Sequence, residues 1–150
     1  MNIEDLKKLR EETGAGVMEV KHALEEFNGD YNKAKEDLMK KGLAKAAKKA
    51  DRVTKDGLVY SYVHATGKVG SIVAVACETD FVAKTEEFKK LCHEVALQVC
   101  TEDYTSVEIL LESEFIKDAS KKISDLVNET IAKLGEKIEI KKFSRISVLE

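Results

Sequence analysis

Apolar residues in the first 42 positions recur every three or four residues, which is the spacing of one face of a helix. Two short segments that contain glycine, Thr13-Gly14-Ala15-Gly16 and Asn28-Gly29, interrupt this pattern, and Asp30 can cap the helix that follows. We therefore predict three short helices, the last of which ends at Gly42. Their apolar positions are Ile3, Leu6, Leu9, Val17, Val20, Leu24, Phe27, Tyr31, Ala34, Leu38 and Met39.

A module of about 40 residues is near the lower size limit for independent folding. Its exposed turns and apolar side chains are therefore candidate docking surface, with Val17 and Met18 as the first candidates. Core positions for both residues remain the alternative.

Residues 43–56 form a basic connection to the rest of the chain. Lys45, Lys48, Lys49 and Arg52 lie among four alanines, which predicts a solvated helical linker. A nucleic-acid-binding stripe is disfavoured here because the stretch lacks the interleaved aromatic residues that stack on bases.

From Gly57 the period of the pattern changes to two, which indicates a strand with Leu58, Tyr60, Tyr62 and His64 on one face. Thr66-Gly67-Lys68 supplies a turn, and residues 69–77 return as the antiparallel partner. The last six residues of that partner, 72–77, are all apolar, so we expect a strand that is buried on both faces. His64 at the hairpin end is either an ordinary turn residue or an exposed group that contacts a partner.

The rest of the chain alternates between helix and strand. An amphipathic helix is predicted by one helical face that holds Phe88, Leu91, Cys92, Val95, Ala96 and Val99. Residues 102–120 are less periodic and suggest a helix or a loosely packed helical hairpin. A clear helix from Ile123 ends at Gly135, and residues 137–149 read as a final strand with a bulge near Lys141-Lys142.

The predicted fold class is therefore α+β. It comprises an N-terminal three-helix module similar to a ubiquitin-associated (UBA-like) module over residues 1–42, a basic helical linker over residues 43–56, and a core over residues 57–150. The core is a three-stranded antiparallel sheet packed with helices.

The segment Cys77-Glu78-Thr79-Asp80-Phe81-Val82-Ala83 joins the apolar strand to the following helix. One interpretation is that Asp80 caps the helix while Phe81 packs its start against the core as a hydrophobic staple. The other is that Phe81 projects into a partner. The residues alone favour the staple.

Composition limits the function classes. The 150 residues carry a formal net charge of −3, with 43% hydrophobic and 35% charged residues, and no apolar run is long enough to span a membrane. Nucleic acid is not expected as the main partner. Three cysteines without a CxxC pair fit a reducing compartment, and Met1 is followed directly by an amphipathic helix, so we expect a cytoplasmic protein without a signal peptide.

No known catalytic, metal-binding or cofactor-binding motif is present, so we do not predict an enzyme, a metal site or a cofactor. Two alternatives remain open: a cysteine hydrolase built from His64 and Cys77, and a ubiquitin-binding module fused to a scaffold.

Four motifs in a fixed order make the chain resemble the elongation factor Ts family, the guanine-nucleotide exchange factors of elongation factor Tu, over nearly all 150 residues. The motifs are Leu9-Arg10-Glu11-Glu12-Thr13-Gly14-Ala15-Gly16-Val17-Met18, Lys45-Ala46-Ala47-Lys48-Lys49-Ala50, Cys77-Glu78-Thr79-Asp80-Phe81-Val82-Ala83-Lys84 and Ala132-Lys133-Leu134-Gly135-Glu136-Lys137-Ile138.

The resemblance implies how the chain binds its partner. The three-helix module would dock on the nucleotide-binding domain of elongation factor Tu through Lys7, Val17 and Met18. Asp80 and Phe81, flanked by Thr79 and Val82, would enter that domain near the magnesium side of the nucleotide pocket and loosen GDP. The resemblance therefore reverses the preference for Phe81 as a staple.

His64 matches a histidine that approaches the phosphate-binding loop in long members, where it lies in the second copy of a duplicated core. This chain has a single core copy. The resemblance therefore implies a homodimer in which Asp80-Phe81 and His64 act from different subunits. The long helical insertion of larger members is cut down around residues 102–120.

Overall fold

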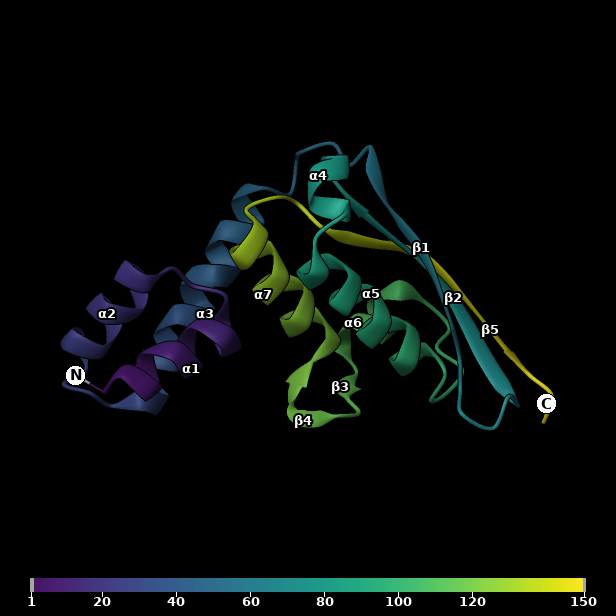
Figure 1. The fold of residues 1–150 in the computed structure, drawn as a ribbon, viewed down its shortest axis with the longest axis horizontal. Helices are drawn as coiled ribbons and strands as arrows, with labels where there is room; N and C mark the ends of the chain where they lie inside the picture. Colours follow the sequence, from purple (N-terminus) through teal and green to yellow (C-terminus); the bar gives the residue numbers. More distant parts are fainter. Residues whose placement is uncertain (1, 150) are drawn as a thin grey trace. The chain divides into compact units, whose positions relative to one another are not determined.

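The computed structural model describes residues 2–149 and has an α+β fold in which helices precede a three-stranded antiparallel sheet (Figure 1). Met1 and Glu150, the ends of the predicted domains, lie outside the described residues. The chain divides into two compact units. The first comprises the residues up to Arg52 together with Asn128–Lys137, and the second comprises Val53–Val127 and the residues from Ile138 onward.

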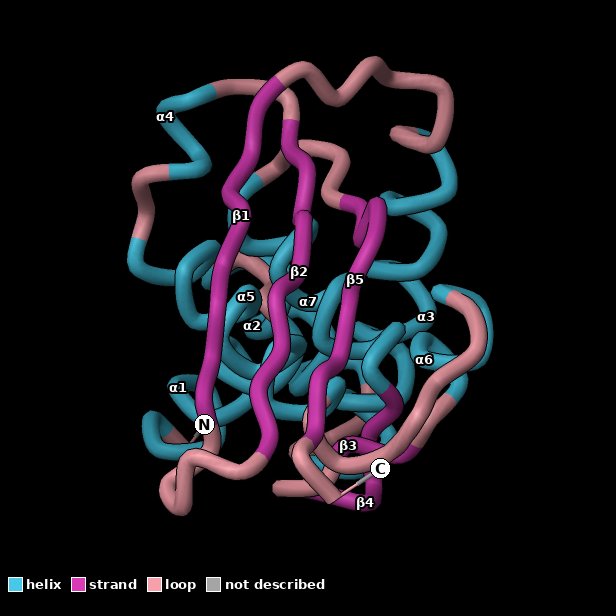
Figure 2. The backbone as a smooth tube through the Cα atoms, turned by 90° about the vertical axis from the view of Figure 1, so that its right-hand side faces the viewer, coloured by secondary structure: helices cyan, strands magenta, loops and turns pink. Residues whose placement is uncertain are grey.

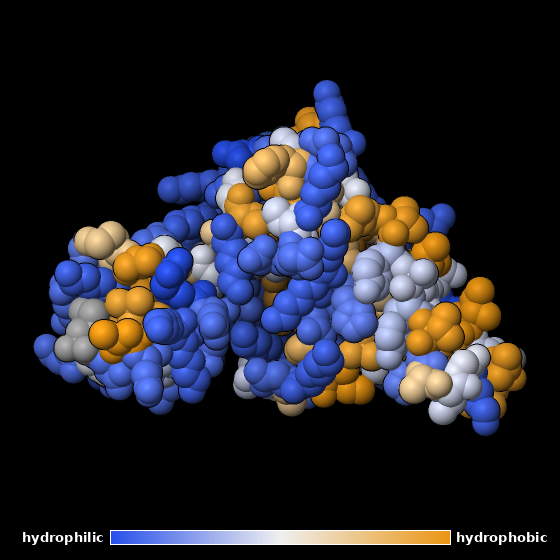
Figure 3. Space-filling model, in the orientation of Figure 1, coloured by the Kyte–Doolittle hydropathy of each residue, from blue (hydrophilic) through white to orange (hydrophobic). Residues whose placement is uncertain are grey.

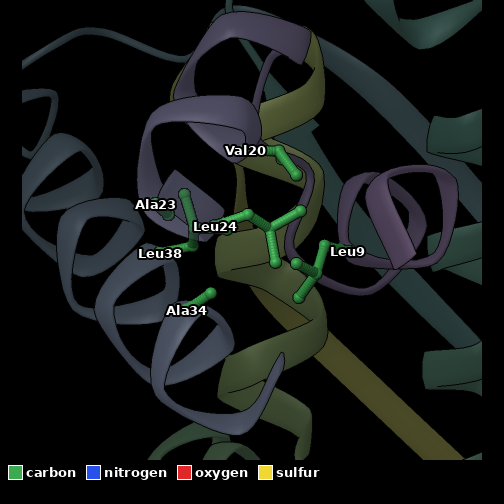
Figure 4. Close-up of a cluster of buried hydrophobic side chains, with 6 residues drawn as sticks. All are labelled: Leu9, Val20, Ala23, Leu24, Ala34 and Leu38. Carbon is green, nitrogen blue, oxygen red and sulfur yellow. The ribbon is translucent and has the colours of Figure 1, made fainter. Parts of the chain in front are cut away.

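The first unit begins with three helices, α1 (Ile3–Thr13), α2 (Val17–Glu26) and α3 (Tyr31–Lys48). Their facing sides bury a small apolar core, which Figure 4 shows as side chains converging between the helices. The core residues are Leu9, Val20, Ala23, Leu24, Ala34 and Leu38. The predicted helices and the Asp30 cap are confirmed, since the Asp30 side chain accepts the backbone N–H of Lys33 at 3.2 Å. The UBA-like comparison stays a prediction.

The expected helix end at Gly42 is wrong, because α3 continues to Lys48. A glycine inside a helix costs about 1 kcal/mol relative to alanine, and two ion pairs offset that cost. Lys41 pairs with Asp37 at 2.9 Å one turn away, and Lys45 pairs with Glu19 of α2. Part of the predicted basic linker is thus the last turns of α3.

Glu19 has a second partner at the start of α2. Its carboxylate accepts the backbone N–H of Gly16 at 3.0 Å, which satisfies a donor that the helix itself leaves unpaired. The hydrogen bond from Lys45 and then the one from Gly16 hold the pKa of Glu19 below its usual range. Glu19 therefore stabilises both the beginning of α2 and its packing beside α3.

The sheet of the second unit consists of β1 (Asp56–Val63), β2 (Val69–Cys77) and β5 (Glu139–Ser147) in the order β1-β2-β5, all antiparallel. The predicted hairpin and final strand are confirmed. The predicted bulge is also confirmed, because Ala74 pairs with Lys142 and Val75 with Ile140, which leaves Lys141 as the extra residue.

Only one face of the sheet is covered. Helix α5 (Glu86–Val99) packs against β1 and β2, and Val73, Val75 and Cys77 are buried on that side. The expectation that residues 72–77 are buried on both faces is wrong, since the side chain of Ile72 is 47% exposed. In Figure 2 the three strands lie in front of α5 and α6 with their near face open.

The expected helical hairpin over residues 102–120 is wrong for its second half. A short helix, α6 (Val107–Glu112), is followed by a small antiparallel pair, β3 (Glu114–Phe115) and β4 (Asp118–Lys122). The buried side-chain amide of Gln98 holds β3 in place, because it hydrogen-bonds to the backbone of this segment in the way that a neighbouring strand does. It donates to the carbonyl of Glu114 at 2.8 Å and accepts the N–H of Ile116 at 2.9 Å.

Helix α7 (Ile123–Leu134) connects the two units, with its first turns in the second unit and its last turns in the first. It ends at Gly135 as predicted, where φ is +75°. Among residues 2–149 no helix combines the length and the apolar character needed to cross a bilayer.

Candidate partner-binding site

The most exposed aromatic side chain in the described part of the chain lies at the turn after β2. There a one-turn helix, α4 (Asp80–Ala83), connects the strand to α5. Thr79 caps α4, because its hydroxyl accepts the backbone N–H of Val82 at 3.3 Å. The expected cap at Asp80 is therefore wrong by one residue.

Phe81 points away from the core. Its side chain is 79% exposed, whereas the next two residues, Val82 and Ala83, are buried. A single helical turn can bury only one of its sides, and here Val82 and Ala83 occupy the buried side. The staple interpretation is wrong, and the turn presents an aromatic ring to solvent.

Asp80 is the acidic neighbour of that ring. Its carboxylate lies 3.5 Å from the ammonium of Lys84, one turn further along, and both side chains are largely exposed. An ion pair in this setting contributes at most about 1 kcal/mol, so Asp80 can exchange Lys84 for another partner at low cost. Thr79 and Val82 complete the predicted set at this turn, Thr79 as the cap and Val82 as the buried anchor.

His64 is exposed, as expected for a group at the hairpin end, and its Nδ1 lies 3.2 Å from the hydroxyl of Tyr62. Sequence reasoning missed another ring that contacts the tyrosines of this strand. His93 of α5 makes edge-to-face contacts with Tyr60 and Tyr62, and its Nδ1 lies 3.0 Å from the Tyr60 hydroxyl. Alternation along β1 predicted that both tyrosines share one face of the strand, but it could not indicate which residue of α5 they contact.

The hairpin separates His64 from the Phe81 turn. Asp56 pairs with Cys77 at one end of the hairpin, and Val63 pairs with Gly70 at the other. His64 follows Val63 and the Phe81 turn follows Cys77, so they are about eight strand residues apart, on the order of 25 Å. The predicted site residues of the core are therefore not brought together within one chain.

The same separation excludes a catalytic pair of His64 and Cys77. Cys77, Cys92 and Cys100 are all buried free thiols, and burial, with a smaller contribution from neighbouring Cys77, raises the pKa of Cys92 to about 12. A thiol of that kind is not a nucleophile at neutral pH. Within residues 2–149 the acidic, histidine and cysteine side chains form no cluster suited to a metal ion.

In the first unit, the predicted docking residues Lys7, Val17 and Met18 are all exposed, so core positions for the two apolar residues are excluded. Ile3 was predicted on the apolar face of its helix, yet it is also exposed. Figure 3 shows apolar side chains at the surface of these N-terminal helices. The helical period alone could not reveal this, because α1 and α2 each have more apolar positions than the small core can bury.

Comparison with known proteins agrees with these motifs. Residues 78–150 match the family model described as elongation factor TS. The elongation factor Ts of Moorella thermoacetica is 41% identical over 191 aligned positions, which cover 97% of this chain and 94% of that protein. The Syntrophomonas wolfei protein of the same name is 40% identical over 192 positions, covering 98% and 90%.

A third relative is a longer protein. The elongation factor Ts of Clostridium acetobutylicum is 49% identical over 142 positions, which cover 95% of this chain and 46% of that protein. The alignments with the two shorter relatives contain more positions than this chain has residues, so those proteins carry segments without a counterpart here. With this identity over nearly its whole length, the chain belongs to the elongation factor Ts family.

Proposed function

We propose that this protein is a guanine-nucleotide exchange factor that binds elongation factor Tu in its GDP form and promotes release of GDP without covalent chemistry. It would act in the cytoplasm. The observation that carries the proposal is the ring of Phe81, which is 79% exposed on a turn that the buried Val82 and Ala83 anchor to the core. Family membership indicates elongation factor Tu as the partner, and the exposed turn carries the Phe81 ring that can enter this partner.

In this proposal Asp80 and Phe81 enter the nucleotide-binding domain near the magnesium side of the pocket. The ring inserts between elements that hold the magnesium ion, and displacement of these elements loosens the phosphates. Binding of the factor and of GDP is then linked: the factor lowers the affinity for GDP by the same ratio as GDP lowers the affinity for the factor.

The energy of one aromatic ring is too small for the whole effect. Burial of a phenylalanine side chain yields about 1.5–3 kcal/mol, or one to two powers of ten in affinity. Acceleration of release by about four powers of ten requires about 5.5 kcal/mol. Additional contacts must therefore hold the ring in place, and the exposed Lys7, Val17 and Met18 of the first unit are the proposed source.

Linkage provides the test of the proposed partner. The chain should bind nucleotide-free elongation factor Tu tightly, and addition of GDP should weaken that binding by several powers of ten, as measured by fluorescence titration. Titration of GDP into elongation factor Tu with and without the chain should give the same ratio. Equal affinity of the chain for the GDP-bound and nucleotide-free forms would contradict the proposal.

We also propose that the chain acts as a homodimer. The distance between His64 and the Phe81 turn supports this, because the two ends of one hairpin cannot reach one pocket together. A two-fold axis perpendicular to the strands would set the His64 end of one subunit beside the Phe81 end of the other.

The open face of the sheet is the proposed dimer surface. Residues directly opposite one another in a sheet share a face, which aligns Ser61, Ile72 and Ser144 in one row and Val63, Gly70 and Ile146 in the next. Val59, Val63, Ile72 and Ile146 are all exposed. A shallow groove lined by Val63, Ile72, Ile146 and Val148 crosses this face. A flat apolar surface of this kind, with small residues between the larger ones, suits self-association.

Ile146→Lys should convert the dimer into a monomer while the chain stays folded, because the side chain is 74% exposed and supports no core. Light scattering at micromolar concentration measures the change. Ile109→Lys is the matched control, since it replaces another exposed isoleucine of the same unit that lies on α6 rather than on the sheet. A wild-type monomer, both free and bound to elongation factor Tu, would contradict the dimer.

A further inference from the structure

We propose that Thr85 and Cys77 are positioning residues that hold α4 at both ends so that Phe81 is presented in one orientation. This inference rests on the proposed exchange function. Neither residue contacts the partner in this scheme. Each acts through the backbone of the turn that carries the ring.

Cys77 anchors the entry to the turn. Its side chain is completely buried at the end of β2, and its thiol donates to the backbone carbonyl of Thr79 at 3.1 Å. Thr79 is the cap residue of α4, so this hydrogen bond connects the beginning of the helical turn to the covered face of the sheet.

Thr85 anchors the exit from the turn, and its hydroxyl has two roles. It accepts the backbone N–H of Phe88 at 3.2 Å, which caps α5, and it donates to the backbone carbonyl of Val82 at 2.7 Å. Phe88 is fully buried under the sheet. The second hydrogen bond therefore connects the end of α4 to the most firmly packed helix of the second unit.

These two connections matter because a single helical turn has little stability of its own. Of its four residues, only Val82 and Ala83 are buried. If one anchor is lost, the turn samples several conformations, and binding must first select the one in which Phe81 fits. Such a loss of preorganisation lowers the rate of the step in which the ring inserts, while the docking contacts elsewhere are unchanged.

Two substitutions at position 85 separate positioning from folding. Thr85→Asp keeps a good helix cap for α5 but has no proton to donate to Val82, whereas Thr85→Ser keeps both hydrogen bonds. We expect Thr85→Asp to lower the maximal rate of GDP release about three- to tenfold, the effect of one lost hydrogen bond. The concentration that gives half of the maximal rate should be unchanged, the unfolding temperature should fall by only a few degrees, and Thr85→Ser should behave as wild type.

Two substitutions at position 77 keep the inference testable if a Thr85 variant folds poorly. Cys77→Ala removes the donor to Thr79, and Cys77→Ser restores a donor of similar size, so the serine variant should recover the maximal rate that the alanine variant loses. Wild type and Phe81→Ala are measured alongside. A wild type without acceleration would overturn the proposed function itself. Normal maximal rates in folded Thr85→Asp and Cys77→Ala, beside an impaired Phe81→Ala, would overturn only the positioning inference.

Discussion

Phe81→Ala should fold as wild type does and lose most of its ability to accelerate GDP release, by about ten- to hundredfold. The fold should be preserved because the ring is 79% exposed and supports no part of the core. The activity should fall because the ring supplies about 1.5–3 kcal/mol of burial when it enters the partner, and alanine supplies little of it. Stopped-flow release of fluorescent GDP from elongation factor Tu measures the rate.

Ile116→Ala is the matched control for that variant. Ile116 is another exposed apolar residue of the second unit, but it lies at the β3–β4 turn. The Ile116→Ala variant should accelerate the release of GDP from elongation factor Tu as much as the wild type does. A folded Phe81→Ala protein with near-normal acceleration would remove Phe81 from the mechanism.

Gly14→Ala should strongly destabilise the first unit. Gly14 follows α1 with φ of +72°, and an added Cβ would lie 2.3 Å from the backbone carbonyl oxygen of Glu129 in α7. The left-handed conformation costs a residue with a Cβ about 1–2 kcal/mol, and displacement of a packed helix adds about 1–3 kcal/mol. Denaturant unfolding should show a loss of about 2–5 kcal/mol in the free energy of unfolding.

Gly29→Ala separates these two contributions. Gly29 has a similar φ of +82° after α2, but an added Cβ would have no heavy atom within 4 Å. Only the conformational cost applies there, about 1–2 kcal/mol. Equal losses in the two variants would show that the contact between Gly14 and Glu129 contributes nothing to stability. The glycine-rich part of the first motif is thus explained by packing, independently of any partner.

Hydrophobic periodicity was sufficient for most of the fold. It predicted α1, α2, the β1–β2 hairpin, α5, α7 and the bulge in β5, because each of these has a repeating apolar face and a terminating residue such as Gly135. It failed at Gly42, where the loss of helix propensity is offset by the ion pairs of Lys41 and Lys45, one of which is made with a residue of a different helix. Contacts between elements are not visible in a local pattern.

The site was predicted less well than the fold, for related reasons. The apolar run at residues 72–77 indicated burial on both faces, but the side chain of Ile72 lies on a face that no helix within residues 2–149 covers. The exposure of Phe81 could not be deduced from its own type, because an aromatic residue after a cap is more often a staple. Family resemblance corrected that preference. The role of Gln98 depends on a hydrogen bond to the backbone of Glu114, far away in the sequence, which no local pattern predicts. The role of Thr85 depends on a local hydrogen bond to Val82, but the apolar pattern does not show which capping residues make such a bond.

Release of fluorescent GDP from preformed elongation factor Tu with bound magnesium, followed by stopped flow as wild-type protein is increased to saturation, tests the central claim most directly. The proposed function predicts a rate that rises to a plateau about four powers of ten above the intrinsic rate. Release that stays at the intrinsic rate at every concentration of folded wild-type protein would contradict it.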